Sequence, residues 1–98
     1  MELLETILNR RSVRKYNDKE VGGETLQSIL EAGLLAPSSR NLKPVEFIVI
    51  RDKAMLHQLA RAKTAGSGML KGASCAVVVI GGSEKSDAWI EDCSIAMT

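Results

Sequence analysis

Residues 36–50 read Ala-Pro-Ser-Ser-Arg-Asn-Leu-Lys-Pro-Val-Glu-Phe-Ile-Val-Ile, and the local character of the chain changes sharply within this stretch. Its first part, residues 37–44, combines prolines, serines and an asparagine, residue types that favour turns. Its second part, Val45–Ile50, is rich in β-branched residues and lies between Pro44 and Asp52. That composition is typical of a strand. The stretch therefore predicts a loop that leads directly into a strand.

Helical periodicity flanks this stretch on both sides. The preceding helix is expected to follow a turn at Gly22 and Gly23 and to end near Ala36, because Pro37 disfavours helical geometry in the residue before it. A short amphipathic helix is expected at the N-terminus and a third helix after Val45–Ile50. The apolar positions are Leu3, Leu4, Ile7 and Leu8 in the first helix and Leu26, Ile29, Leu30 and Leu34 in the second. In the third helix they are Met55, Leu56, Leu59 and Ala60, which are expected to face inward.

A second strand is expected at Cys75–Ile80, a continuous apolar run of the kind buried on both sheet faces. Glycines 66, 68 and 72 predict a flexible connection before it, and glycines 81 and 82 are expected to end it. The last segment, Asp87–Thr98, has helical spacing but lacks a closing glycine, proline or basic residue. Two strands rarely form a stable sheet alone. We therefore expect either a truncated chain or a core that another chain completes.

Composition narrows the possible functions. The 98 residues are 45% hydrophobic and 26% charged, with a net charge of +1. This balance argues against a general polyanion binder. Neither a membrane-spanning run nor a secretory signal is evident, so a cytoplasmic protein is expected. Cys75 and Cys93 are expected to be free thiols, and with His57 they form no credible metal set. His57 is expected to be a surface residue rather than a catalyst.

Two segments could bind a ligand. Arg10-Arg11-Ser12-Val13-Arg14-Lys15 places four cations and one hydroxyl within a short run, and guanidinium groups match phosphate oxygens bidentately. Residues 36–44 offer hydroxyls, backbone N–H groups and an amide suited to a flavin ring or a nucleobase. The alternatives, taken separately, are a solvated basic turn and an ordinary Pro/Ser turn.

Taken together, the order and spacing of these segments resemble the nitroreductase family of flavoenzymes. The family begins with a short helix that runs into an Arg-x-Ser-x-Arg/Lys element, here Arg10–Arg14. A Pro-Ser-Ser/Ala-x-Asn-x-Gln-Pro-Trp element follows the second helix, here residues 37–45, and leads into a strand with a Phe-Ile-Val-type run, here residues 47–50. Residues 73–79 and 87–92 fall where the family places its next strand and its central helix. The resemblance covers nearly the whole chain.

The resemblance implies an α+β fold with a mixed, mostly antiparallel sheet flanked by helices, present here as the N-terminal part of one FMN-binding domain. It also implies a homodimer with FMN at the subunit interface. Arg10, Ser12 and Arg14, with Arg11 assisting, would hold the phosphate and the pyrimidine side of the flavin. The segment that reaches the same flavin from the partner subunit would contribute Pro37, Ser38, Ser39 and Asn41. FMN would take a hydride from NADH or NADPH and pass electrons to a nitroaromatic, quinone or related acceptor, so no acid–base triad is expected.

The chain departs from the family pattern in two ways. Lys43-Pro44-Val45 replaces Gln-Pro-Trp, which removes an aromatic ring and introduces a cation beside the expected site. The family's second half, with further strands, late basic residues and a C-terminal extension, is absent from these residues. Two alternatives to a flavoenzyme therefore stay open. One is a non-catalytic module that binds a phosphorylated ligand through the arginines, and the other is an interaction subunit whose apolar last helix docks on a partner.

Overall fold

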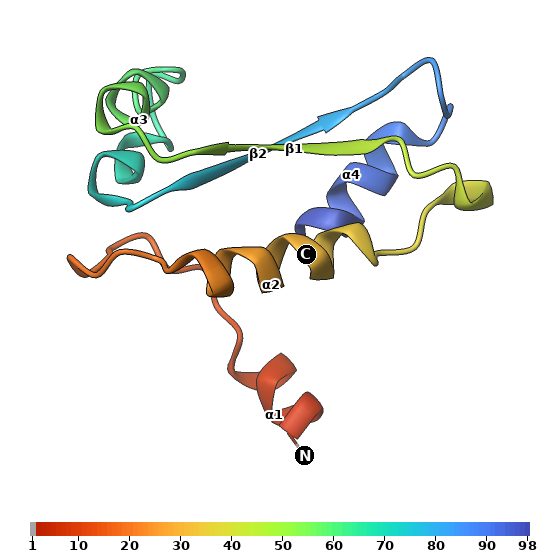
Figure 1. Cartoon of the computed structure of the whole chain (residues 1–98), viewed down its shortest axis with the longest axis horizontal. Coiled ribbons are helices and arrows are strands. Elements are labelled where there is room, and N and C mark those ends of the chain that lie inside the picture. Colours follow the sequence, from red (N-terminus) through yellow and green to blue (C-terminus); the bar gives the residue numbers. More distant parts are fainter. Residues whose placement is uncertain (1) are drawn as a thin grey trace.

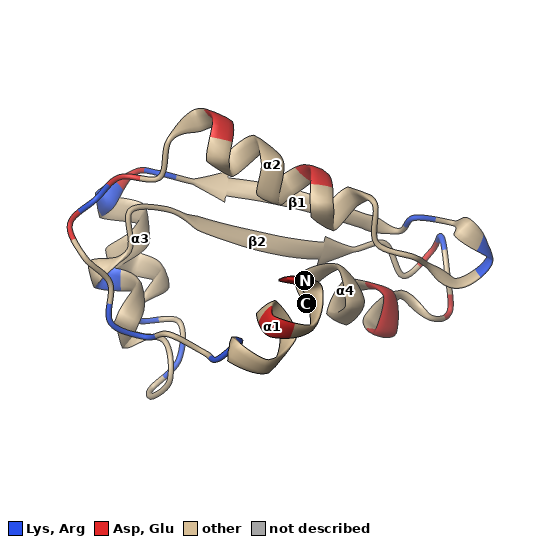
Figure 2. Ribbon diagram, turned by 90° about the horizontal axis from the view of Figure 1, so that it is seen from below, with Lys and Arg blue, Asp and Glu red and all other residues tan. Residues whose placement is uncertain are grey.

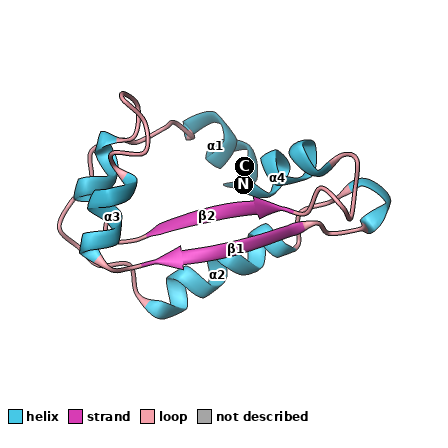
Figure 3. Ribbon diagram, turned by 90° about the horizontal axis from the view of Figure 1, so that it is seen from above, coloured by secondary structure: helices cyan, strands magenta, loops and turns pink. Residues whose placement is uncertain are grey.

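Two antiparallel strands form the centre of the computed structural model, which describes residues 2–98. Strands β1 (Val45–Ile50) and β2 (Ala76–Gly81) pair from Val45 opposite Gly81 to Ile50 opposite Ala76. Within residues 2–98 the chain has four α-helices besides these strands: α1 (Glu2–Asn9), α2 (Gly23–Leu34), α3 (Lys53–Leu59) and α4 (Trp89–Met97). The α+β class with antiparallel strand pairing is confirmed in this part of the domain (Figure 3).

Helices α2 and α4 lie on the same side of the strands (Figure 1). Helix α4 contacts β2, β1 and α2. Close approach is possible because Gly33 and Gly81 lack side chains: a Cβ at Gly33 would lie 2.7 Å from Cζ of Phe47. A cavity of about 170 Å³ remains between these elements, lined by residues such as Ile29, Phe47 and Met97. The packing is therefore close at the glycines and incomplete between them.

The best-buried apolar side chains lie where α3 meets the short 3₁₀ segment η2 (Gly68–Gly72). Leu56 has no exposed surface, and Ala60 and Ala73 are 7% exposed. Asp52 caps α3, since its Oδ1 accepts a hydrogen bond from the N–H of Ala54 at 3.4 Å. Burying an aliphatic side chain of this size stabilises the fold by about 2 kcal/mol. This cluster holds α3 against η2, the two elements that lie between β1 and β2 in the sequence.

Helix α1 projects away from the rest of the chain (Figure 1). All four of its large apolar side chains are more than 60% exposed, namely Leu3, Leu4, Ile7 and Leu8. Ile90, Ile95 and Met97 on α4 are also exposed, at 59%, 46% and 71%. Exposed apolar surface of this extent is unusual for a monomer. Helices α1 and α4 therefore present apolar surface that the rest of the described chain leaves uncovered.

Several sequence expectations need correction. Helix α2 ends at Leu34 rather than near Ala36, and Gly23 is its first residue instead of part of a turn. Met55 is 43% exposed because α3 has only one side against η2. Strand β2 begins after Cys75 and includes Gly81. It is also half-buried, with Ile80 38% exposed, because in this chain helices cover only one of its faces.

Candidate functional site

The basic segment between α1 and α2 is irregular and lies on the surface. Arg10, Arg11, Ser12 and Arg14 all lie on the surface after α1 ends. In the part of the chain that the structure describes, the three guanidinium groups make no ion pair or hydrogen bond to another residue. Arg10 also borders a hollow shared with Met97 and Thr98 at the end of α4. The donors of this segment are therefore available to an anionic ligand.

A cavity of about 560 Å³ lies beside the basic segment, between residues 13–21 and the start of β2. Its wall is fixed by two hydrogen bonds that Val21 makes: its N–H donates to Oγ of Ser74 at 3.1 Å, and its carbonyl accepts from Arg51 at 3.1 Å. Lys15, Lys19 and Tyr16 line it from one side and Cys75 from the other. Ligand sites commonly have volumes in this range. The cavity and the arginines thus form a basic, accessible region.

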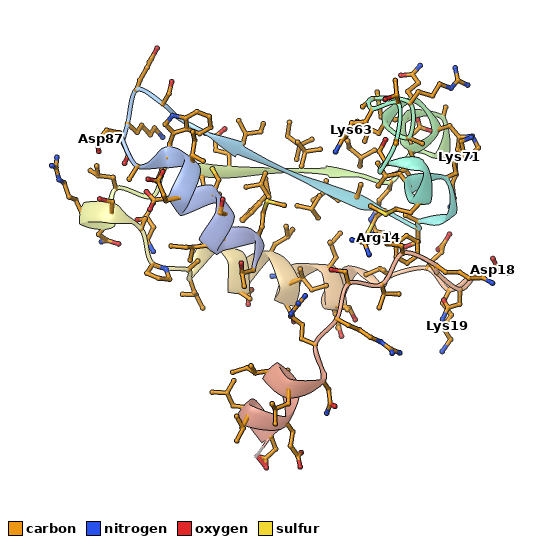
Figure 4. The ribbon with its side chains drawn as sticks, turned by 180° about the vertical axis from the view of Figure 1, so that it is seen from behind. Arg14, Asp18, Lys19, Lys63, Lys71 and Asp87 are labelled. Carbon is orange, nitrogen blue, oxygen red and sulfur yellow. The ribbon has the colours of Figure 1, made fainter. Side chains whose placement is uncertain are left out.

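Positive charge gathers at this end of the molecule. Figure 2 shows Lys and Arg concentrated around α3 and the segment before α2. In Figure 4, Arg14, Lys19, Lys63 and Lys71 lie at one end of the ribbon together with a single labelled acid, Asp18, and Asp87 lies at the other end. A local basic surface raises the concentration of anionic ligands even when the net charge is near zero. The charge distribution therefore favours an anion at this end.

The second candidate segment, residues 37–44, is built around the 3₁₀ turn η1 (Ser39–Asn41), which the sequence had indicated only as loop. Arg40, Asn41 and Lys43 have φ angles of 53°, 55° and 50°, in the left-handed region. Each non-glycine residue there costs on the order of 1 kcal/mol. Such a concentration of strain persists only where other contacts hold the backbone, and it is frequent at binding sites.

Hydrogen bonds within the segment provide part of that restraint. The Ser38 carbonyl accepts from the N–H of Asn41 at 3.0 Å, and Ser38 Oγ accepts from the N–H of Lys43 at 3.0 Å. Because Ser38 Oγ is the acceptor in that bond, its own O–H can still donate to a ligand. Pro44 is fully buried, and its carbonyl accepts from the N–H of Gly82 at 2.8 Å. The segment is thereby anchored at its C-terminal end.

The cation of Lys43 has a structural partner. Its Nζ donates to the Ala36 carbonyl at 2.7 Å, just beyond the end of α2. A cation near the C-terminus of a helix is favoured by the helix dipole. The departure from the family pattern at this position therefore closes the loop onto α2, in addition to placing positive charge near the segment.

Asp92 is a residue of this region that the sequence did not reveal. It lies in the first turn of α4, is only 3% exposed, and its Oδ1 accepts a hydrogen bond from the N–H of Ser39 at 2.9 Å. Its Oδ2 has no hydrogen-bond partner among the described residues. In the sequence Asp92 follows Glu91 in an amphipathic helix, so it resembles a solvated charge. Only its burial distinguishes it.

The structure does not bring the two candidate segments together within one chain. The basic segment adjoins the start of α2, whereas η1 lies at the opposite end of the strands, beyond the end of α2 (Figure 1). Arg10, Arg11, Ser12 and Arg14 therefore form one group, and Pro37, Ser38, Ser39 and Asn41 form another.

Other candidate chemistry is sparse within residues 2–98. His57 is exposed, and Cys75 and Cys93 are half-buried free thiols. No cluster of three or more His, Cys, Asp or Glu side chains in this range is arranged to hold a metal ion. No helix in the same range is long and apolar enough to cross a membrane.

The structure is that of an α+β protein with an exposed basic segment, and the comparisons identify its class. Residues 7–67 match the nitroreductase family. The chain is 43% identical over 99 aligned positions to the "Putative NADH dehydrogenase/NAD(P)H nitroreductase" of Archaeoglobus fulgidus, covering 97% of this chain and 56% of that protein. This chain belongs to the nitroreductase family.

Solved structures agree with this assignment. A crystal structure of the protein of the same name from Parabacteroides distasonis superimposes with a TM-score of 0.94 at 45% identity, covering 99% of this chain and 58% of that one. An "FMN-dependent Nitroreductase" from Clostridium difficile superimposes with a TM-score of 0.88 at 52% identity, covering 91% of this chain and 52% of that one. The chain thus spans somewhat more than half the length of these relatives. The resemblance inferred from the sequence and the fold it implied are confirmed.

Proposed function

We propose that this chain is part of an FMN-dependent oxidoreductase of the cytoplasm. The enzyme passes reducing equivalents from NADH or NADPH to nitroaromatic, quinone or related acceptors. The observation that carries the proposal is the exposed arginine segment beside a cavity of about 560 Å³, in a chain 52% identical over its matched part to a protein named as FMN-dependent. Family membership alone leaves the activity open, because related folds host different reactions.

The donor set fits FMN. The phosphate of FMN is a dianion, and Arg10, Arg11 and Arg14 offer guanidinium forks that match its oxygens, with the Ser12 hydroxyl as a neutral donor. The flavin ring presents carbonyl oxygens and ring nitrogens at its edge. Ser38, Ser39 and Asn41 supply hydroxyl and amide groups that bond such atoms, and Pro37 supplies apolar surface.

The proposed assembly is a homodimer with FMN between the subunits. Arg14 lies at one end of the strands and η1 at the other, so we expect the arginines of one subunit and the η1 turn of its partner to meet at the same flavin (Figures 1 and 4). The exposed apolar faces of α1 and α4 supply surface that association would bury. A dimer therefore accounts for both the separated donors and the uncovered helices.

When bound, FMN would supply the site with hydride-transfer chemistry between the nicotinamide and the acceptor. The residues of this chain bind and orient it. The arginines fix the phosphate end, and the η1 turn holds hydrogen-bond donors toward the ring. The strained backbone at Arg40, Asn41 and Lys43 presets that geometry, which reduces the entropy lost on binding.

Native mass spectrometry of the full-length protein, combined with its visible absorption spectrum, tests the proposal. We expect a dimer with one FMN per subunit, a flavin band near ~450 nm, and bleaching of that band when NADH or NADPH is added anaerobically. A colourless protein that takes up no added FMN contradicts the proposal. Stable FMN binding without reduction by either nucleotide would instead favour the non-catalytic binding module.

A further inference from the structure

Asp92 occupies a position that is unfavourable for a carboxylate unless it has a specific partner. It is 3% exposed on a helix that packs on both strands and on α2. Burying an ionised carboxylate is costly, and the cost falls only when hydrogen bonds compensate. Its Oδ1 has one such bond, to the N–H of Ser39, and its place in the first turn of α4 is favoured by the helix dipole.

That single bond joins two elements that are far apart in the sequence. Asp92 and Ser39 are separated by 53 positions, and Ser39 is the first residue of η1. The next two residues, Arg40 and Asn41, both have left-handed backbone angles. Ser39 thus immediately precedes the first left-handed residue of the turn, and Asp92 restrains its N–H from outside the loop.

We propose that Asp92 is a positioning residue of the candidate flavin site. Its carboxylate fixes the backbone N–H of Ser39, and it thereby holds Ser38, Ser39 and Asn41 in the arrangement that presents their donors to the ligand. This inference rests on the proposed function and adds a residue to it that does not itself touch the flavin. The acceptor oxygen of Asp92, rather than its charge, is the part that acts.

Two variants of Asp92 in the full-length protein distinguish the role of its hydrogen-bond-accepting oxygen from the role of its negative charge. Asp92→Asn keeps an oxygen that accepts from Ser39, so we expect its dissociation constant for FMN to stay within about threefold of the wild-type value. Asp92→Ala removes the acceptor, and we expect affinity to fall about tenfold or more. Ser94→Ala, on the exposed side of the same helix, is the matched control. Melting temperatures of the apo proteins identify any variant that fails to fold.

A second pair of variants tests whether Asp92 acts through Ser39. Ser39→Pro removes the N–H, and the site accommodates proline because Ser38 has extended angles (φ −138°, ψ 158°) and Ser39 begins the turn. Ser39→Ala is the reference for the lost hydroxyl. In the Ser39→Pro background, Asp92→Ala should cause no further loss of FMN affinity, because interacting residues give non-additive effects. Fully additive losses would overturn the proposal.

A readout without FMN separates this inference from the proposed function. Amide hydrogen exchange at Ser39 in the apo protein should be slow in the wild type and in Asp92→Asn, and faster in Asp92→Ala. If the wild type binds no FMN, the proposed function fails, and Ser39 exchange alone decides whether Asp92 positions the turn. The inference is overturned if Asp92→Ala leaves both exchange and affinity unchanged, or if Asp92→Asn loses as much affinity as Asp92→Ala.

Discussion

Gly81, near the end of β2, lies directly against the indole ring of Trp89 at the start of α4. A Cβ built on Gly81 would overlap a ring carbon of Trp89 and would lie 2.7 Å from Sγ of Cys93. The absence of a side chain at Gly81 thus sets how closely α4 packs on the strands. Since Asp92 lies between Trp89 and Cys93 in sequence, the same contact determines where its carboxylate meets the η1 turn.

Substituting Gly81 tests this packing. We expect Gly81→Ala to lower the free energy of unfolding by about 1–3 kcal/mol, the usual cost of overpacking a close contact. Gly82→Ala is the matched control, because a Cβ there would meet its nearest atoms at an ordinary 3.5 Å. Urea denaturation of the two variants measures the difference. Equal stability of Gly81→Ala and Gly82→Ala would show that α4 can shift without cost.

The α3–η2 cluster should be sensitive to the loss of Leu56. Leu56 has no exposed surface, so Leu56→Ala is expected to lower the free energy of unfolding by about 2–5 kcal/mol through lost burial and a new cavity. Its neighbour Met55 is 43% exposed, and Met55→Ala should cost less than about 1 kcal/mol. Thermal unfolding of both variants checks the contrast, which would vanish if α3 packed with its other face inward.

The arginine segment should control cofactor affinity. Arg14→Ala and Arg10→Ala each remove a charge-assisted hydrogen-bond donor worth about 1.5–3 kcal/mol. In the full-length protein we expect FMN affinity to fall about tenfold to a hundredfold, as measured by flavin fluorescence titration. Arg61→Ala, an exposed arginine just after α3, changes the net charge equally and should leave affinity nearly unaltered. Wild-type affinity in both Arg14→Ala and Arg10→Ala would remove this segment from the site.

The left-handed backbone at Arg40 predicts a specific pattern of tolerance. Arg40 has a φ of 53°, which asparagine adopts readily and β-branched residues strongly avoid. We expect Arg40→Asn to preserve stability, and Arg40→Val to be less stable than Arg40→Asn by about 1 kcal/mol or more. Chemical denaturation of Arg40→Asn and Arg40→Val compares their free energies of unfolding. If valine is tolerated as well as asparagine, the turn adopts another conformation in solution.

Local sequence patterns predicted much of the fold. Strand β1 has the expected bounds because the β-branched residues between Pro44 and Asp52 fit a pleated, half-buried surface. The helices occur where apolar residues recur at helical spacing. The inward face of α3 was only partly right, since Met55 is exposed while Leu56 is buried. Periodicity identifies an apolar stripe, but the neighbouring element decides which part of that stripe it covers.

The family could be predicted from the sequence alone, because the residue types and the spacing of the arginine segment and of the Pro-Ser-Ser-Arg-Asn segment carry that information. The tertiary structure decided three further features: the left-handed turn at Arg40, the separation of the two segments, and the burial of Asp92 beneath Ser39. The separation of the segments and the burial of Asp92 depend on how elements distant in sequence pack, whereas the turn is held both by its own hydrogen bonds and by the bond from Ser39 to Asp92. The physical reason is that a carboxylate has the same chemistry in any helix. Only when the surrounding fold removes it from water does the hydrogen bond to its partner become important for stability.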